Sequence, residues 1–294
     1  MSAEKQRLIG YIAADTRGMP PSDIASLLSA HDYAAVDWTM EQFDPLDNPA
    51  SQLADLVSLA ADHGLSVRQL MVHQDYVVDE PRVWEERIRR TELALEAAAQ
   101  AGIPTVGVLT GPNRWETGHA EIGRDVSEAR AWSLALTALE RILRRAEDLG
   151  SVLVCLEPCW GTLARDRYRA EYAIGRLPSA RLGINLDPSH FVMSGDDVAD
   201  LVRSWGDRIG HVHLKDAFGV QGDVGRDFIF LLPGEGSVRW AELFGALDDV
   251  GYSGAMSVEF EAFALLDGPL RGDIGAGMRL ARELVRGLTA ATTP

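Results

Sequence analysis

Short apolar runs rich in β-branched residues alternate with longer amphipathic segments along the whole chain of 294 residues. In the longer segments, such as residues 51–64, 83–102 and 128–150, apolar residues recur every three or four positions, which is typical of a helix packed on one side. The short runs predict strands buried on both faces, as in a parallel sheet. These predicted strands are Arg7–Ala13, Ala34–Thr39, Ser66–His73, Thr105–Thr110, Val152–Glu157, Leu182–Asp187, Ile209–Leu214 and Ala255–Glu259.

Eight consecutive strand–helix units predict an α/β fold, a (β/α)8 TIM barrel. The length suits one such barrel, and no Pro/Gly/Ser-rich linker divides the chain, so we expect a single domain over residues 1–294. An open doubly wound sheet is the alternative. No GxGxxG motif follows the first predicted strand, and we therefore favour the barrel.

Composition narrows the choice of partners. The formal net charge of −16 argues against nucleic acid or an anionic membrane surface, because both need a basic face. Residues 1–15 lack the apolar core of a signal peptide, and no apolar run is long enough to span a bilayer. The only cysteines, Cys155 and Cys159, are too few for a disulfide framework. We expect a cytoplasmic protein that acts on small molecules.

Ionisable residues lie at the ends of four consecutive predicted strands: Glu157, Asp187, His213 and Glu259. The active site of a βα barrel lies at the carboxyl ends of its strands, so these side chains should meet at one rim. Three carboxylates in so small a volume repel one another unless a cation lies between them. Carboxylates with one imidazole suit Mn²⁺, Mg²⁺, Co²⁺ or Zn²⁺, and the four residues therefore predict one divalent metal site.

The stretch HVHLKD contains two candidate ligands. Side chains alternate along a strand, so His211 and His213 face the same side, with His213 nearer the rim. We expect His213 to be the ligand and His211 to lie one layer lower, as an interior histidine or a support for the ligands. Lys215 shares this side, and two roles are equally open to it: contact with a substrate oxygen or an ion pair with a carboxylate.

Five motifs together resemble the xylose-isomerase-like TIM-barrel superfamily: VCLEP, INLDPSH, HVHLKD, PGEG and GYSGAMSVEFE. Within it they are similar to the sugar phosphate isomerase/epimerase group, which includes ketose 3-epimerases, hydroxypyruvate isomerase and the inosose isomerases and dehydratases. The resemblance implies that Glu157, Asp187, His213 and Glu259 hold one divalent ion, most often Mn²⁺. It also implies that Glu157 and Glu259 are the catalytic acid/base pair.

Further residues are candidates for substrate binding. The resemblance implies that His190 contacts substrate oxygens, and it gives Arg226 the part of a substrate-contacting arginine. His73 ends the third predicted strand at the rim, where it could contact substrate or act as a base. Trp38 and Trp115 fall in strand-to-helix connections, where aromatic rings stack well on sugar faces. Simple packing is the alternative for His73 and for both tryptophans.

Two features bear on the substrate. Ketose 3-epimerases carry a second glutamate six residues after the ligand of the fifth strand, and Leu163 occupies that position here, which argues against a free ketohexose. The long stretch 216–236 contains Phe218, Phe228 and Phe230 and predicts a loop that covers the substrate. Packing of this loop against a neighbouring subunit is the alternative.

The predicted chemistry is removal of a proton next to a carbonyl, with a metal-stabilised enediolate, in an isomerase or epimerase of small carbohydrates or keto-polyols. A lyase that eliminates water or an aglycone from a 3-keto sugar, a 3-keto-glycoside or an inosose begins with the same step and stays open. An abasic-site endonuclease is less favoured, because the rim offers few histidines for a multi-zinc site. A non-enzymatic accessory subunit is a further alternative. We expect a homo-oligomer, and a hetero-oligomer with a smaller subunit is also possible.

Overall fold

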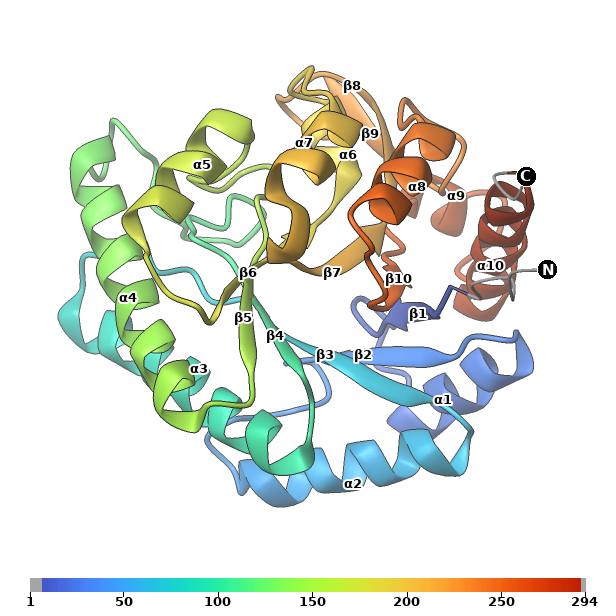
Figure 1. Ribbon diagram of the computed structural model, residues 1–294, viewed down its shortest axis with the longest axis horizontal. Helices are drawn as coiled ribbons and strands as arrows, with labels where there is room; N and C mark the ends of the chain where they lie inside the picture. Colours follow the sequence, from blue (N-terminus) through green and yellow to red (C-terminus); the bar gives the residue numbers. More distant parts are fainter. Residues whose placement is uncertain (1–6, 292–294) are drawn as a thin grey trace.

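Residues 7–291, which the computed structural model describes, form a closed barrel of eight parallel strands with helices around its outside (Figure 1). The strands follow the order β1-β10-β7-β6-β5-β4-β3-β2 around the barrel. Each barrel strand therefore pairs with the barrel strands before and after it in the chain, and a hairpin inserted between β7 and β10 lies outside this order. The barrel strands are β1 (Ile9–Ile12), β2 (Ala35–Thr39), β3 (Ser66–Val72), β4 (Thr105–Val108), β5 (Leu153–Leu156), β6 (Leu182–Leu186), β7 (Ile209–Leu214) and β10 (Met256–Val258).

The prediction of a (β/α)8 barrel is confirmed, and each predicted strand is present. The seventh strand has the predicted bounds, whereas the others are slightly shorter. Strands β5, β6 and β10 end one residue before Glu157, Asp187 and Glu259, although the backbone N–H groups of Glu157 and Glu259 still donate to the neighbouring strands. These carboxylates therefore lie on the first loop residue after a strand, at the rim where an active site of this fold is built.

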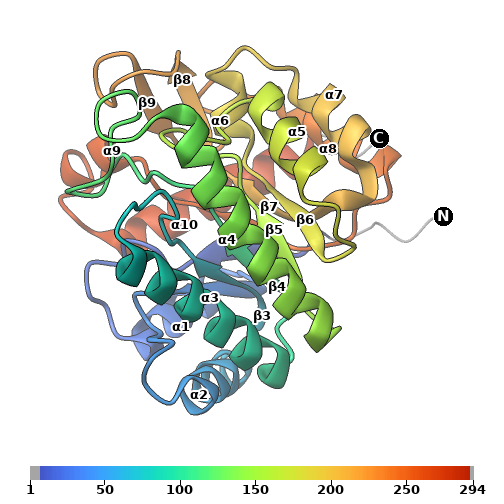
Figure 2. The ribbon, with the colours of Figure 1, turned by 90° about the vertical axis from the view of Figure 1, so that its left-hand side faces the viewer.

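The helices bury an apolar face against the barrel and expose a polar face, as their three- and four-residue periodicity predicts. The long helices α3 and α4 lie side by side along one flank (Figure 2). No helix within the described residues is long and apolar enough to cross a membrane. The helices are α1 (Pro21–Ala30), α2 (Pro49–Asp62), α3 (Pro81–Ala101), α4 (Glu128–Leu149), α5 (Arg167–Arg176), α6 (Pro188–Val192), α7 (Val198–Trp205), the 3-10 helix η1 (Gly206–Arg208), α8 (Trp240–Asp249), α9 (Phe263–Asp267) and α10 (Ile274–Ala290).

The stretch predicted as a covering loop contains an antiparallel hairpin, β8 (Asp216–Gly219) and β9 (Phe228–Leu231). Its first residue, Asp216, is fully buried and accepts hydrogen bonds from the backbone nitrogens of Ala217, Gly234 and Val238 and from the indole of Trp240. A Cβ atom on Gly236 would lie 2.3 Å from the Asp216 carboxylate, so only glycine fits there. One buried carboxylate thus joins the base of the hairpin to the loop that leads into α8.

Candidate metal centre and substrate cavity

Four residues form a cluster that can hold a metal ion at the carboxyl end of the barrel: Glu157, Asp187, His213 and Glu259. Each is buried, and each offers a donor atom that lies within 4.8 Å of the other three. We call this group the metal-ligand cluster. The structure therefore brings together the four side chains that the sequence proposed as ligands, from the ends of β5, β6, β7 and β10.

The spacing of these donors fits a common divalent ion. Nδ1 of His213 lies 3.2 Å from Oε1 of Glu157 and 3.3 Å from Oε2 of Glu259. Two ligands at about 2.1 Å from one ion are separated by about 3.0 Å in octahedral and about 3.4 Å in tetrahedral geometry. The donor set of three carboxylates and one imidazole, without a thiolate, favours Mn²⁺, Mg²⁺, Co²⁺ or Zn²⁺ over a soft cation.

Local structure fixes two of the carboxylates. Asp187 caps α6, because its Oδ1 accepts the backbone N–H of Ser189 at 2.8 Å, and this leaves Oδ2 to point toward the cluster. Oε2 of Glu157 accepts a hydrogen bond of 3.0 Å from the side-chain amide of Asn185, and its Oε1 faces His213. Each of these carboxylates therefore has one oxygen committed to the protein and one directed to the site.

The cluster contains strong electrostatic interactions. Burial alone would lower the pKa of His213, but Glu157 and Glu259 raise it well above its ordinary value. Burial alone would raise the pKa of Glu259, but Lys215 and His213 hold it well below its ordinary value. The pKa of Asp187 rises to about 7, chiefly because the group is buried. Positive charge from His213 and Lys215 thus offsets part of the carboxylate charge where a metal ion would do so.

Lys215 forms a buried ion-pair network beside the cluster. Its Nζ atom lies 2.9 Å from Asp187, 2.7 Å from Glu259 and 2.8 Å from Glu261, and 4.5 Å above the ring of Phe230. Of the two roles that the sequence left open, pairing with carboxylates is the one seen. The same ammonium also lines a cavity at this rim, so it can reach a bound molecule as well.

Sequence reasoning missed two residues that support the ligands. Gln69 of β3 and Asn185 of β6 are fully buried, and they place Oε1 and Nδ2 at 3.3 and 2.9 Å from Nε2 of His213. For Asn185 the available signal was a carboxamide within an otherwise apolar strand, whereas β3 also contains Ser66 and Arg68. Asn185 precedes Asp187 by two positions, so strand alternation places it on the same inward side, one layer deeper.

A cavity of about 420 Å³ opens above the cluster. It is lined by Glu157, Glu259 and Lys215, and by three predicted substrate contacts, His73, His190 and Trp115. Phe230 and Ile229 of the hairpin line it as well, together with Val224 and Gly225 from the turn between its strands. The stretch 216–236 therefore forms part of the wall, at the place where a covering loop was expected.

The two histidines of this cavity are predominantly neutral. Burial, with the charge of Lys215, lowers the pKa of His190 to about 3, and burial also lowers the pKa of His73. Nε2 of His190 lies 3.4 Å from Asp187 and 3.8 Å from Glu157, and Nε2 of His73 lies 4.0 Å from Glu157. A neutral imidazole can donate a hydrogen bond to one substrate oxygen without adding charge.

Two predicted substrate contacts lie elsewhere. Trp38 is fully buried in the hydrophobic core and does not line the cavity, because Asp37 takes the inward position of β2 and the next side chain points to the other side. Asp37 lies 2.8 Å from Nε2 of His211, one layer below the cluster, as expected for an interior histidine. Arg226 is exposed in the hairpin turn, pairs with Asp223, and is outside the cavity lining.

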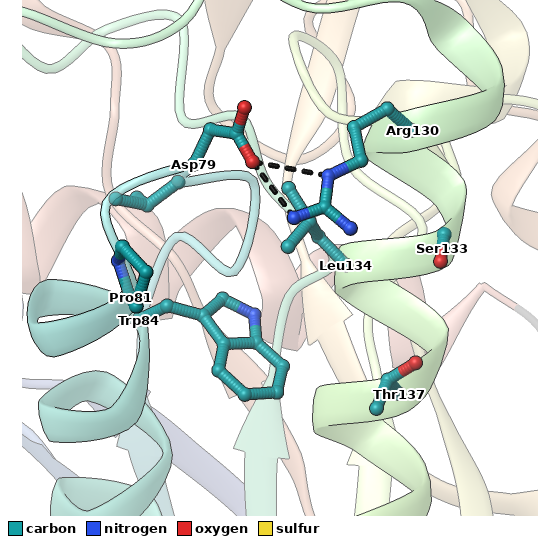
Figure 3. Close-up of a pocket in the computed structure, with 8 residues that line it drawn as sticks. Asp79, Pro81, Trp84, Arg130, Ser133, Leu134 and Thr137 are labelled. Atoms are coloured by element: carbon teal, nitrogen blue, oxygen red, sulfur yellow. Dashed lines mark hydrogen bonds and ion pairs between the residues drawn. The ribbon is translucent and has the colours of Figure 1, made fainter.

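Another cavity, of about 270 Å³, lies on the flank between the start of α3 and the middle of α4 (Figure 3). The indole of Trp84 lies below the ion pair between Asp79 and Arg130, whose closest atoms are 2.8 Å apart. This cavity contains no member of the metal-ligand cluster. The rim cavity is therefore the candidate active site.

Comparisons with known proteins agree with this geometry. Residues 25–284 match a family model described as Xylose isomerase-like TIM barrel. A D-psicose 3-epimerase of Enterocloster bolteae is 34% identical over 116 residues, which cover 40% of this chain and 33% of that protein. An Inosose dehydratase of Clostridium perfringens is 26% identical over 159 residues, which cover 50% of this chain and 53% of that protein. The chain thus matches between a third and about half of the length of these relatives.

Solved structures share the fold over nearly the whole chain. The structure of the IOLI protein with a binding zinc atom has a TM-score of 0.70 at 16% identity, and covers 97% of both chains. The apo form of the 3-keto-D-glucoside 4-epimerase YcjR from E. coli has a TM-score of 0.72 at 17% identity, and covers 97% of this chain and 100% of that one. At these identities the likeness concerns the fold alone.

Proposed function

The chain belongs to the Xylose isomerase-like TIM barrel family, and on that premise we propose that it is a divalent-metal-dependent isomerase or epimerase of a small carbohydrate or keto-polyol. The observation that carries the proposal is the convergence of the metal-ligand cluster beside a cavity large enough for such a substrate. The named activities of the epimerase and dehydratase relatives support the substrate class. We expect Mn²⁺, with Mg²⁺, Co²⁺ or Zn²⁺ as alternatives.

The proposed reaction begins with removal of a proton from the carbon next to a substrate carbonyl. Glu157 and Glu259 both line the cavity, and neighbouring positive charge holds the pKa of each below its usual range, so either can accept the proton. A cation bound by the cluster supplies electrophilic stabilisation of the negative charge that develops on a substrate oxygen. Delivery of a proton to the opposite face by the second glutamate, once it has taken a proton from the solvent, inverts the carbon.

The remaining polar groups position the substrate. His73 and His190 line the cavity as neutral imidazoles, and each can bind a hydroxyl or carbonyl oxygen. Trp115 offers a half-exposed ring on the outer wall, where the apolar face of a sugar can stack. The hairpin side chains Ile229 and Phe230 limit water on the hairpin side of the cavity.

A dehydratase or other lyase is the second candidate, and two observations favour it. Leu163, which occupies the position of the second glutamate of ketose 3-epimerases, is fully buried in the core and is not part of the cavity lining. The ammonium of Lys215 lines the cavity next to Glu259, where it can protonate a departing hydroxyl or alkoxide after the first deprotonation. Elimination needs that acid, whereas a simple epimerisation can proceed with the two carboxylates.

The test is a substrate screen of purified protein loaded with Mn²⁺ against ketoses, inososes and 3-keto-glycosides in heavy water. An isomerase or epimerase incorporates deuterium next to the carbonyl and returns a saturated isomer, whereas a lyase gives an unsaturated product or a released aglycone. We expect turnover to stop on chelation and to return with Mn²⁺. Full turnover by the Glu259→Gln protein with metal still bound would refute the acid/base assignment.

A further inference from the structure

A second cavity of about 420 Å³ lies at the same rim, directly beside the substrate cavity. The loops after β4, β5 and β7 form it, and Trp160 lines both cavities. This indole is held in place, because its Nε1 donates a 2.9 Å hydrogen bond to the backbone oxygen of Gly222 and its ring stacks near Trp115 at 6.2 Å. A fixed indole thus borders both the substrate cavity and the second cavity.

The second cavity contains a guanidinium with no carboxylate at ion-pair distance among the described residues. Arg165 lines it and is half-buried, and no carboxylate of residues 7–291 lies within 4.0 Å of its charged nitrogens. Burial and the nearby charge of Arg169 lower its pKa, while the carboxylates of Asp166 and Glu128, beyond ion-pair distance, act in the opposite direction. A partly desolvated cation is unfavourable unless an anion or hydrogen-bond acceptors compensate it.

Neighbouring acids do not neutralise the cavity. Arg114 also lines it, but its nearest carboxylate, that of Asp223, is 4.0 Å away and already binds Arg226 at 2.7 Å. Glu121, the acidic residue in the lining, pairs with Arg124 at 2.8 Å. The positive charges of Arg165 and Arg114 are therefore only partly offset by carboxylates in this cavity, although the whole chain carries a net charge of −16.

We propose that this second cavity binds an anionic group, a phosphate or a carboxylate, carried by the same substrate whose carbonyl end reaches the metal centre. The inference rests on the proposed function and deepens it by naming the substrate class. Planar guanidinium groups bind phosphate and carboxylate oxygens in pairs, and a positive cavity in an acidic protein selects for anions. Because Trp160 is shared, the substrate passes along the edge of its indole from one cavity to the other.

Binding of inorganic phosphate, measured by equilibrium dialysis on the metal-loaded protein, tests the site without any assumption about turnover. Arg165→Gln and Arg114→Gln should each weaken binding by about 10- to 100-fold, the usual effect of losing a charge-assisted hydrogen bond. Arg144→Gln is the matched control, because Arg144 is an exposed arginine of α4 outside the cavity. Equal binding by all four proteins, or no saturable binding by the unchanged protein, would overturn the proposal.

Turnover then decides whether the anion belongs to the substrate. Neutral ketoses or inososes are compared with their phosphorylated and carboxylated counterparts. We expect the charged forms to be preferred, with Arg165→Gln raising their KM by about 10- to 100-fold and Arg144→Gln leaving it unchanged. Saturable phosphate binding together with equal turnover of neutral and charged substrates would refute the claim that the bound anion is part of the substrate. If no carbohydrate reacts at all, the proposed function fails, while the dialysis result still decides whether an anion site exists.

Discussion

Oε1 of Gln69 lies 3.3 Å from Nε2 of His213, on a ring whose other nitrogen faces Glu157 and Glu259. Nε2 also lies 2.9 Å from the amide donor Nδ2 of Asn185, so two carboxamides together hold the ring with Nδ1 toward the carboxylates. The carboxamides of β3 and β6 thus orient the β7 histidine toward the metal-ligand cluster.

Replacing Gln69 with leucine should weaken Mn²⁺ binding by about 10- to 100-fold, because the ring loses a contact that fixes its orientation. Isothermal titration calorimetry measures this effect directly. Gln69→Glu, which keeps an acceptor, should recover much of the affinity. Gln100→Leu, at an exposed position of α3, is the matched control. Unchanged affinity in Gln69→Leu would show that the contact has no positioning role.

Metal affinity should depend on pH in a defined direction. The raised pKa of His213 means that Nδ1 carries a proton at neutral pH in the metal-free protein. Coordination requires that nitrogen to be unprotonated and Asp187, whose pKa is about 7, to be ionised, so binding of one cation near pH 7 should release more than one proton. Apparent affinity should therefore rise at least about tenfold for each unit of pH below the pKa of His213. Calorimetry in buffers of different ionisation enthalpy counts the protons released, and a flat pH profile would contradict this ligand assignment.

Much of this site was predictable, and particular residues show why. Glu157, Asp187 and Glu259 each follow a buried strand directly, and parallel strands in a barrel must end at one rim. Strand alternation also placed His213 nearer the rim than His211, which meets Asp37 one layer deeper. These inferences need only local pattern and the geometry of one fold.

Other features depend on contacts between distant segments. Gln69 and His213 are 144 positions apart, and no local periodicity links them. Trp38 was expected to contact substrate because the end of a strand and the start of a connection look alike in sequence. A difference of one residue along a strand turns a side chain from the inside of the barrel to the side that packs on the helices, where Trp38 lies. The hairpin β8–β9 escaped notice because its strands are short and its stretch is rich in glycine.

Divalent metal should stabilise the fold as well as serve the chemistry. The cluster gathers three buried carboxylates, and a bound ion relieves their mutual repulsion in the folded state only. Mn²⁺ at about one hundred times its Kd should add about 2.7 kcal/mol to the free energy of unfolding. Urea unfolding with Mn²⁺ and with a chelator measures the difference. His213→Ala should abolish it, and an equal gain in that variant would place the ion elsewhere.

Removal of Lys215 should make stability depend strongly on metal. Its ammonium contacts Asp187, Glu259 and Glu261 within 2.9 Å, and Lys215→Met leaves these carboxylates without their counter-charge. Loss of one partner from a buried ion pair costs about 3–5 kcal/mol. We expect a loss of that size in the metal-free variant and a clearly smaller loss with Mn²⁺ bound. An equal loss in both states would mean that lysine and metal do not act on the same carboxylates.

Asp216 should control the hairpin wall of the substrate cavity. Its buried carboxylate accepts hydrogen bonds from three backbone N–H groups and from Trp240, so alanine would leave several buried donors unpaired. The loss should be at least about 3 kcal/mol in the free energy of unfolding, since each hydrogen bond to a charged acceptor contributes about 1.5–3 kcal/mol. Hydrogen exchange should report faster opening of β8 and β9 than of the barrel strands.

Asp223→Ala, an exposed position in the turn of the same hairpin, is the control for Asp216→Ala. A similar loss of stability in Asp223→Ala would argue that the hairpin is held by its tip and not by its base.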